Sequence, residues 1–111
     1  MSRDYRVCLD DILEAIDKIV DFTSGLSARQ FSEDVKTFDA VVRNLEVIGE
    51  AAKNVPDNVR AKSPAFDWRK VAGLRDILIH HYFGLDADII WDIVQNKLPQ
   101  LRQAVQVLLE E

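Results

Sequence analysis

Three observations on the sequence predict an all-α protein, an antiparallel up-and-down bundle of helices. Apolar residues recur at intervals of three or four positions along most of the chain, which is the spacing of one helix face. The 111 residues include only four glycines and three prolines, so few positions interrupt a helix. No stretch has the strict alternation that is typical of a strand. A chain of this length can bury one core, and we expect a single domain over residues 1–111.

The N-terminal part is predicted to form two helices. The first is expected from about Asp4 to Thr23, and Ser24 and Gly25 stop it. Ser27, followed three residues later by Gln30, has the spacing of a capping box and begins a short second helix or turn. The first helix has an apolar stripe made of Leu9, Ile12, Leu13, Ile16, Ile19 and Val20.

A long third helix is expected over residues 32–54, and Pro56 ends it. Residues 56–64 form a connection with room for one helical turn. Asp67 is predicted to cap a helix that runs from Trp68 to about residue 82 and ends near Gly84. Asp86 or Asp88 caps the final helix, in which Pro99 predicts a kink or a second segment near Lys97.

The composition limits the classes of function. The formal net charge of −5 is unlike that of a general nucleic-acid coat protein. Residues 59–75, however, carry five basic side chains and one acidic side chain, and they are either a strip for a phosphate-bearing partner or an ordinary solvated helix face. No apolar run approaches the roughly 18 residues of a membrane span, and the N-terminus lacks the apolar core of a signal peptide, so we expect a cytoplasmic protein that does not enter the membrane.

The most reactive side chains lie together in residues 74–86. Arg75, Asp76, His80, His81 and Tyr82 fall within eight positions, and the two histidines are the only ones in the chain. A fixed cation next to a group that titrates near neutral pH is the combination that phosphodiester chemistry needs. Arginine would hold the phosphate, histidine would act as general acid or base, and Asp76 could set the histidine tautomer.

The helical spacing of this motif does not by itself bring the arginine and histidine together. Arg75 and Tyr82 share one face, as do Asp76 and His80, but Arg75 and His80 diverge by about 140° around a straight helix. Three arrangements could bring them together: the helix loosens toward Gly84, the arginine reaches around, or two copies form a composite cleft across a two-fold axis. The spacing is also compatible with a salt bridge, a hydrogen-bonded histidine and a core-edge tyrosine without catalytic roles. No metal or other cofactor is expected, because adjacent histidines diverge and no cysteine accompanies them.

The segment from Arg75 to Tyr82 resembles the R-x4-H-x-Y motif of the HepT toxins, a branch of the HEPN superfamily. The resemblance extends to residues 45–52, which are similar to the third-helix segment of that family. It also covers residues 68–75 before the motif and residues 91–99 in the last helix. The resemblance extends over most of the chain, and it is more specific than an arginine and a histidine alone.

The resemblance implies a homodimeric HEPN-like helical bundle and a metal-independent endoribonuclease. Such a protein is the toxin of a prokaryotic type VII toxin–antitoxin system, and its partner is an MntA-type minimal nucleotidyltransferase. In the family the motif arginine and histidine are catalytic, and they correspond to Arg75 and His80, with Asp76 as the polar residue after the arginine. The motif tyrosine, Tyr82 in this chain, is the residue to which the partner transfers AMP and so silences the toxin.

Two alternatives stay open at this point. His81 satisfies the looser superfamily spacing, but only His80 has a tyrosine two positions later, so His80 is the predicted catalytic residue. Arg43, Glu46 and Glu50 share a polar stripe and either line the cleft or are solvated helix charges. The rival function is a non-catalytic helical module that presents nucleotide or substrate to an associated nucleotidyltransferase.

Overall fold

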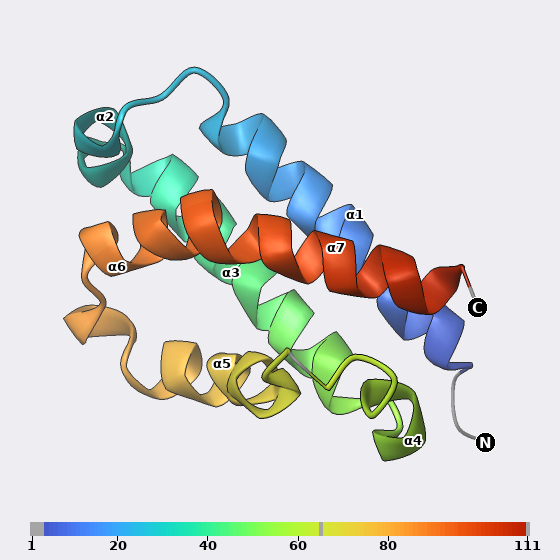
Figure 1. Cartoon of the computed structure of the whole chain (residues 1–111). Coiled ribbons are helices and arrows are strands. Elements are labelled where there is room, and N and C mark those ends of the chain that lie inside the picture. Colours follow the sequence, from blue (N-terminus) through green and yellow to red (C-terminus); the bar gives the residue numbers. More distant parts are fainter. Residues whose placement is uncertain (1–3, 65, 111) are drawn as a thin grey trace.

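The computed structural model describes residues 4–64 and 66–110, and these form helices and turns without a strand. The all-α prediction is confirmed. In chain order the elements are α1 (Tyr5–Thr23), α2 (Ala28–Glu33), α3 (Val35–Lys53), α4 (Asp57–Arg60), α5 (Trp68–His80), the 3-10 turn η1 (Tyr82–Gly84), α6 (Ala87–Asp92), the π-helical turn η2 (Ile93–Lys97) and α7 (Leu98–Leu109) (Figure 1).

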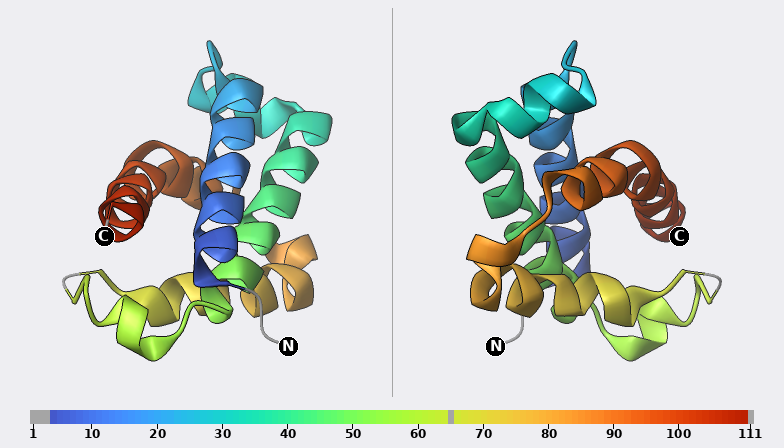
Figure 2. Two further views of the ribbon diagram at one scale, coloured as in Figure 1. Left: turned by 90° about the vertical axis from the view of Figure 1, so that its right-hand side faces the viewer. Right: turned by 90° about the vertical axis from the view of Figure 1, so that its left-hand side faces the viewer.

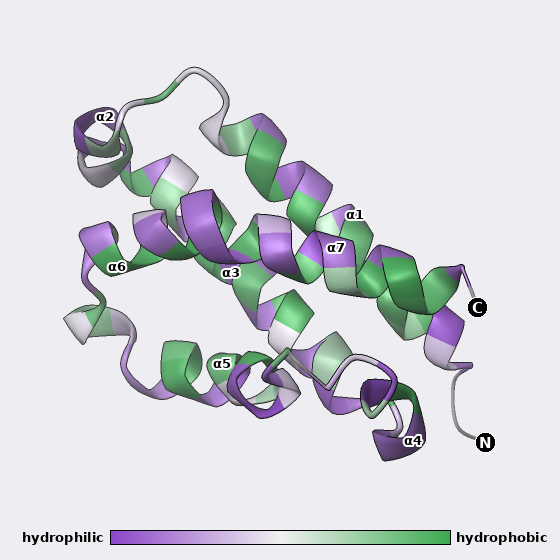
Figure 3. Cartoon of the chain, viewed as in Figure 1, coloured by the Kyte–Doolittle hydropathy of each residue, from purple (hydrophilic) through white to green (hydrophobic). Residues whose placement is uncertain are grey.

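The core lies between α1, α3 and α7. Figures 1 and 2 show α1 and α3 side by side as an antiparallel pair, with α7 packed obliquely against α1 and α5 crossing α3. Each long helix has both hydrophobic and hydrophilic bands, as the periodicity predicts (Figure 3). The buried side chains include Leu9, Ile12, Ile16, Ile19, Val41, Leu45, Ile48, Leu101, Val105 and Leu108. Val20, which the spacing places in the α1 stripe, is 46% exposed.

The helix ends follow the capping residues. Asp4 caps α1, and Gly25, with a φ of 79°, turns the chain after that helix. The predicted capping box of Ser27 and Gln30 begins α2. The predicted start of the third helix is wrong by three residues, because the side chain of Asp34 accepts hydrogen bonds from the Thr37 backbone and hydroxyl and so begins α3 at Val35.

The connection after α3 contains one helical turn, α4, as the sequence allows. A side chain of α4 caps the C-terminal end of α3. Arg60 in α4 donates hydrogen bonds to the carbonyl oxygens of Ala52, Lys53 and Val55 at distances of 2.8–3.0 Å. These carbonyls are at or just beyond the last turn of α3, where a helix leaves its own carbonyls without partners. Arg60, one of the five basic residues predicted to form a strip over residues 59–75, therefore has a structural role at the end of α3.

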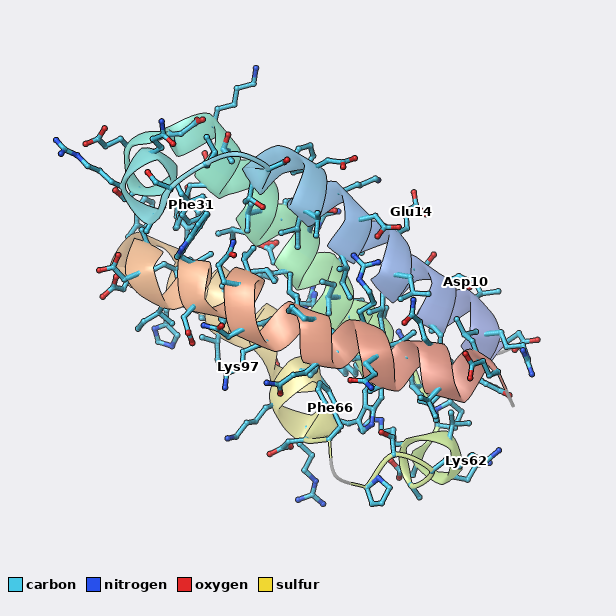
Figure 4. The ribbon with its side chains drawn as sticks, turned by 45° about the horizontal axis from the view of Figure 1, so that its top comes forward. Asp10, Glu14, Phe31, Lys62, Phe66 and Lys97 are labelled. Carbon is cyan, nitrogen blue, oxygen red and sulfur yellow. The ribbon has the colours of Figure 1, made fainter. Side chains whose placement is uncertain are left out.

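The last helix is continuous but irregular. Asp86 rather than Asp88 provides the N-cap of α6. The π-helical turn η2 precedes Pro99, whose ring cannot donate a hydrogen bond and clashes with a regular preceding turn. The predicted irregularity near Lys97 is confirmed. Phe31 from α2 is fully buried near this end of the molecule and packs 5.2 Å from the Trp91 ring of α6 (Figure 4).

The helix that carries the motif is the least buried of the long helices. Trp68 and Leu78 are its only fully buried residues, whereas Ile77 and Ile79 are 55% and 45% exposed. One face of α5 is packed on α3, and another leaves apolar side chains in contact with water. None of the helices in the described part of the chain combines the length and the apolar character needed to cross a bilayer.

Candidate functional site

The motif helix ends at His80, two residues before the predicted end. Asp67 caps its start, as expected, by accepting from the Lys70 backbone nitrogen. At the other end the His81 backbone donates to the Ile77 carbonyl, and the chain then tightens into η1. The helix thus loosens toward Gly84, which is one of the three arrangements that the sequence left open. The argument that Arg75 and Tyr82 share a helix face does not apply, because Tyr82 lies outside the helix.

Arg75 projects from α5 toward α3 and contacts two carboxylates. Its Nε atom lies 3.3 Å from Glu50 of α3, and its Nη1 atom lies 3.5 Å from Asp76. The three side chains are 42–66% exposed, so each ion pair contributes little free energy and can exchange for another anion. The structure places Glu50 beside the motif arginine, and the Glu50 side chain is 51% exposed, so both interpretations of Glu50, cleft-lining and solvated charge, stay open.

The His80 ring is held by a main-chain group. Its Nδ1 atom lies 2.8 Å from the carbonyl oxygen of Asp76. A carbonyl oxygen only accepts, so Nδ1 carries the proton and Nε2 of the neutral ring is the free proton acceptor. The tautomer is thus set as the sequence suggests, but by the Asp76 backbone and not by its carboxylate, which pairs with Arg75. His81 is exposed, and its backbone closes the helix.

Tyr82 lies against the beginning of α3. Its hydroxyl donates a hydrogen bond to Asp39, and its ring lies 6.5 Å from the Phe38 ring and 5.4 Å from the Phe83 ring. The hydrogen bond to Asp39 is the main reason why the pKa of Tyr82 is raised above its ordinary value, with smaller contributions from burial and from the charge of Asp39. The phenol therefore stays protonated at neutral pH.

Gly49 sets the distance between α3 and α5 at the motif arginine. A Cβ atom at this position would lie 2.7 Å from the Arg75 backbone nitrogen and 3.2 Å from the Val71 carbonyl oxygen. Only a residue without a side chain allows this approach. The glycine thus positions the backbone of the residue that faces Glu50.

Sequence reasoning missed Asp39 and Gly49 as parts of the site. Asp39, Arg43, Glu46 and Glu50 follow one another at intervals of four, three and four residues, so they form one stripe of α3. That spacing was the available signal for Asp39. Arg43 and Glu46 pair with each other at 3.9 Å, and Glu46 is the more buried of the two.

The motif side chains reach the surface of the protein, and the hollows beside α5 lie elsewhere on that helix. Two hollows of about 440 and 430 Å³ are next to the first half of α5. The first is lined by α4, by Ala61 and Pro64 and by residues 66–69, and the second lies between α3, α5 and α7, with Phe66 and Lys97 among its lining residues (Figure 4). Arg75, His80 and Tyr82 line neither of them. Across residues 4–64 and 66–110, no three His, Cys, Asp or Glu side chains are grouped as metal ligands.

The comparisons with known proteins agree on one family. The family model described as "Ribonuclease HepT-like" matches residues 12–108. "Putative RNase MJ0127" of Methanocaldococcus jannaschii is 47% identical over 99% of this chain and 91% of its own length. "Probable ribonuclease HepT" of Thermococcus cleftensis is 43% identical over 92% of this chain and 93% of its own length. No solved structure gives a significant match.

Proposed function

The chain belongs to the HepT-like ribonuclease family, and from this membership we propose that it is the RNA-cleaving toxin of a toxin–antitoxin pair. The observation that carries the proposal is the presence in one motif of two groups: an arginine whose carboxylate partners can be exchanged for a phosphate, and a histidine whose tautomer is fixed. Arg75 makes only solvent-exposed ion pairs, and His80 keeps Nε2 free while its Nδ1 is held by the Asp76 carbonyl.

The proposed reaction is cleavage by the neighbouring ribose hydroxyl. Nε2 of His80 takes the proton of the 2′-hydroxyl, whose oxygen attacks the adjacent phosphorus. Arg75 exchanges its carboxylate partners for the phosphate and stabilises the charge that develops on the phosphate oxygens. The bond from phosphorus to the 5′-oxygen breaks, the 5′-oxygen leaves as a hydroxyl after taking a proton from water, and the other product carries a 2′,3′-cyclic phosphate. The chain's own residues supply the cation and the proton-transfer group.

We propose further that two copies form the complete cleft. In a single chain Arg75 faces Glu50, whereas His80 lies at the end of α5, and the motif residues line neither of the two hollows beside α5. Apolar side chains that would favour contact with a second copy lie among the motif residues: Ile77, Ile79 and the fully exposed Phe83. Pairing of these surfaces would bury the apolar side chains and bring the two motifs to either side of one open cleft.

Silencing by a partner nucleotidyltransferase is the last part of the proposal. Tyr82 is 37% exposed and follows the motif histidine by two residues, so a nucleotide attached to its hydroxyl would lie next to the RNA site. The attached phosphate would compete for Arg75, and the base would block access.

The test of the catalytic assignment uses purified protein and total RNA. Arg75→Ala and His80→Ala should each abolish cleavage without changing the helical circular-dichroism spectrum, while His81→Ala should have a milder effect. Cleavage should continue in excess chelator. Loss of activity with chelator that a divalent ion restores would overturn the mechanism, and a larger loss in His81→Ala would overturn the histidine assignment. Growth arrest on expression of this chain alone separates the toxin from a non-catalytic module.

A further inference from the structure

Tyr82 is tied to a helix far from it in the sequence. Its hydroxyl donates a hydrogen bond to Asp39 of α3, and 43 positions separate the two residues. The backbone hydrogen bonds around Tyr82 are local, because His81 donates to Ile77 and Leu85 donates to Tyr82 itself. The link to Asp39 and the contact with Phe38 therefore hold this side chain on α3.

The pair is accessible to an enzyme that approaches from solvent. Asp39 is exposed, and Tyr82 is 37% exposed although the rings of Phe38 and Phe83 are its neighbours. These ring contacts limit how the phenol can turn. The hydrogen bond directs the hydroxyl proton at the Asp39 carboxylate, so the free lone pair of the phenolic oxygen faces away from it.

We propose that Asp39 positions the Tyr82 hydroxyl and accepts its proton when Tyr82 takes up a nucleotidyl group. This inference rests on the proposed silencing of the site at Tyr82. The nucleotide donor is a nucleoside triphosphate held by the partner nucleotidyltransferase.

The step balances as a displacement at phosphorus. The phenolic oxygen forms a bond to the α-phosphorus, and the bond from that phosphorus to the oxygen bridging to the β-phosphate breaks. Pyrophosphate leaves with the electron pair. The phenolic proton passes along the existing hydrogen bond to Asp39, which becomes neutral and returns the proton to water. Such an acceptor is needed because the phenol is protonated at neutral pH.

Neighbouring residues are less suited to this role. The Asp76 carboxylate pairs with Arg75, and the Tyr82 hydroxyl directs its proton to Asp39 rather than to the ring of His80. Asp39 already accepts the hydrogen bond through which the leaving proton would pass. The raised pKa of Tyr82, caused first by this hydrogen bond, agrees with the geometry.

The experiment measures the rate of AMP transfer to the full chain. The parent, Asp39→Asn and Asp39→Ala are incubated with the MntA-type nucleotidyltransferase and ATP, and intact mass is followed with time. Asp39→Asn retains an oxygen that accepts the hydrogen bond but cannot take the proton. Asp10→Asn is the matched control, because Asp10 is an exposed aspartate on α1 (Figure 4).

Transfer to Asp39→Asn should be slower by about 10²-fold, the contribution typical of a general base. Asp39→Ala should be slower by at least as much, and Asp10→Asn should match the parent. Equal rates for the parent and both Asp39 variants would overturn the inference while leaving silencing at Tyr82 intact. A parent that gains no AMP, or gains it at another residue, would overturn the proposed silencing itself and this inference with it.

A second measurement tests the hydrogen bond without the partner. The chain has two tyrosines, so Tyr5→Phe leaves Tyr82 as the only one whose ionisation changes the ultraviolet absorbance. Adding Asp39→Ala to this background should move the tyrosinate transition to lower pH, because the acceptor that favours the protonated phenol is removed. An unchanged transition would overturn the proposed contact in solution.

Discussion

Replacement of Gly49 by alanine tests whether the close approach of α3 to α5 positions the motif arginine. The new Cβ atom would lie 2.7 Å from the Arg75 backbone nitrogen and 3.1 Å from the Arg75 Cβ. Ordinary van der Waals contact begins at 3.4 Å, so α5 must shift by about 0.7 Å, the difference between 3.4 and 2.7 Å. The nearest atom belongs to the backbone and cannot rotate away.

Two opposing terms set the change in stability. Alanine favours a helix over glycine by about 1 kcal/mol. Overpacking of a close helix contact costs about 1–3 kcal/mol. We therefore expect a net loss of about 1 kcal/mol, which corresponds to a fall in Tm of about 4–8 °C in a chain of this size.

Gly49→Ala should lower the rate of RNA cleavage by more than the loss of folded protein alone would explain. A shift of α5 moves Arg75 away from Glu50 and changes its position relative to the phosphate. Because misplacement by about 1 Å can reduce a rate by about 10²-fold, we expect RNA cleavage by Gly49→Ala to fall by about 10–10²-fold. The rates are compared well below both melting temperatures, so that unfolding does not contribute.

Gly73→Ala is the matched control on α5. A Cβ atom at Gly73 would meet nothing within 4 Å, so this substitution gains helix propensity without a clash. Its Tm should stay equal or rise, and its cleavage should remain close to that of the parent. The reasoning is refuted if Gly49→Ala is as stable and as active as Gly73→Ala.

Four further predictions concern other parts of the molecule. Arg60→Ala should lower the unfolding free energy by about 1–3 kcal/mol in urea titrations, because it removes hydrogen bonds to carbonyls at the end of α3; an unchanged midpoint would contradict this role. The pKa of Asp34 is lowered by hydrogen bonds from the Thr37 backbone and hydroxyl. The stability that Asp34 contributes is therefore present above the ordinary aspartate pKa and is lost as the pH falls through the lowered value. Asp34→Ala should make the unfolding free energy depend less on pH in this acid range. Tyr82→Phe should cut RNA yet escape silencing, and equal silencing of this variant would place the modification elsewhere. Light scattering should report about twice 12.7 kDa for the parent and a monomer for Ile77→Asp, whereas a monomeric, active parent would refute the two-copy cleft.

Most of the helical architecture could be predicted from local sequence. The periodicity of apolar residues identified the helices, and short-range caps such as Ser27 and Asp67 located their starts. These features depend on residues within four positions of one another, so a single sequence contains them. The start of the third helix was the exception. The sequence predicts a separate short helix or turn before it, but the break lies at Asp34, which both ends α2 and begins α3, and not at residue 32.

The motif residues could also be identified from the sequence, but their contacts could not. Helical spacing predicted a shared face for Arg75 and Tyr82, and the end of α5 at His80 removed that relation. Spacing also assigned the histidine tautomer to the Asp76 side chain, whereas its carbonyl performs that task. Both differences arise at a helix terminus, where regular periodicity ends and backbone groups become available as partners.

The sequence by itself determined the all-α class, the caps and the position of the reactive motif, because these follow from interactions between near neighbours in the chain. Only the tertiary structure decided which residues of α3 the motif would meet. Asp39 contacts Tyr82, Glu50 contacts Arg75, and Gly49 permits the approach of the two helices. Such pairs depend on the register in which α5 packs against α3, and that register is set by core packing and steric fit between segments that are distant in sequence.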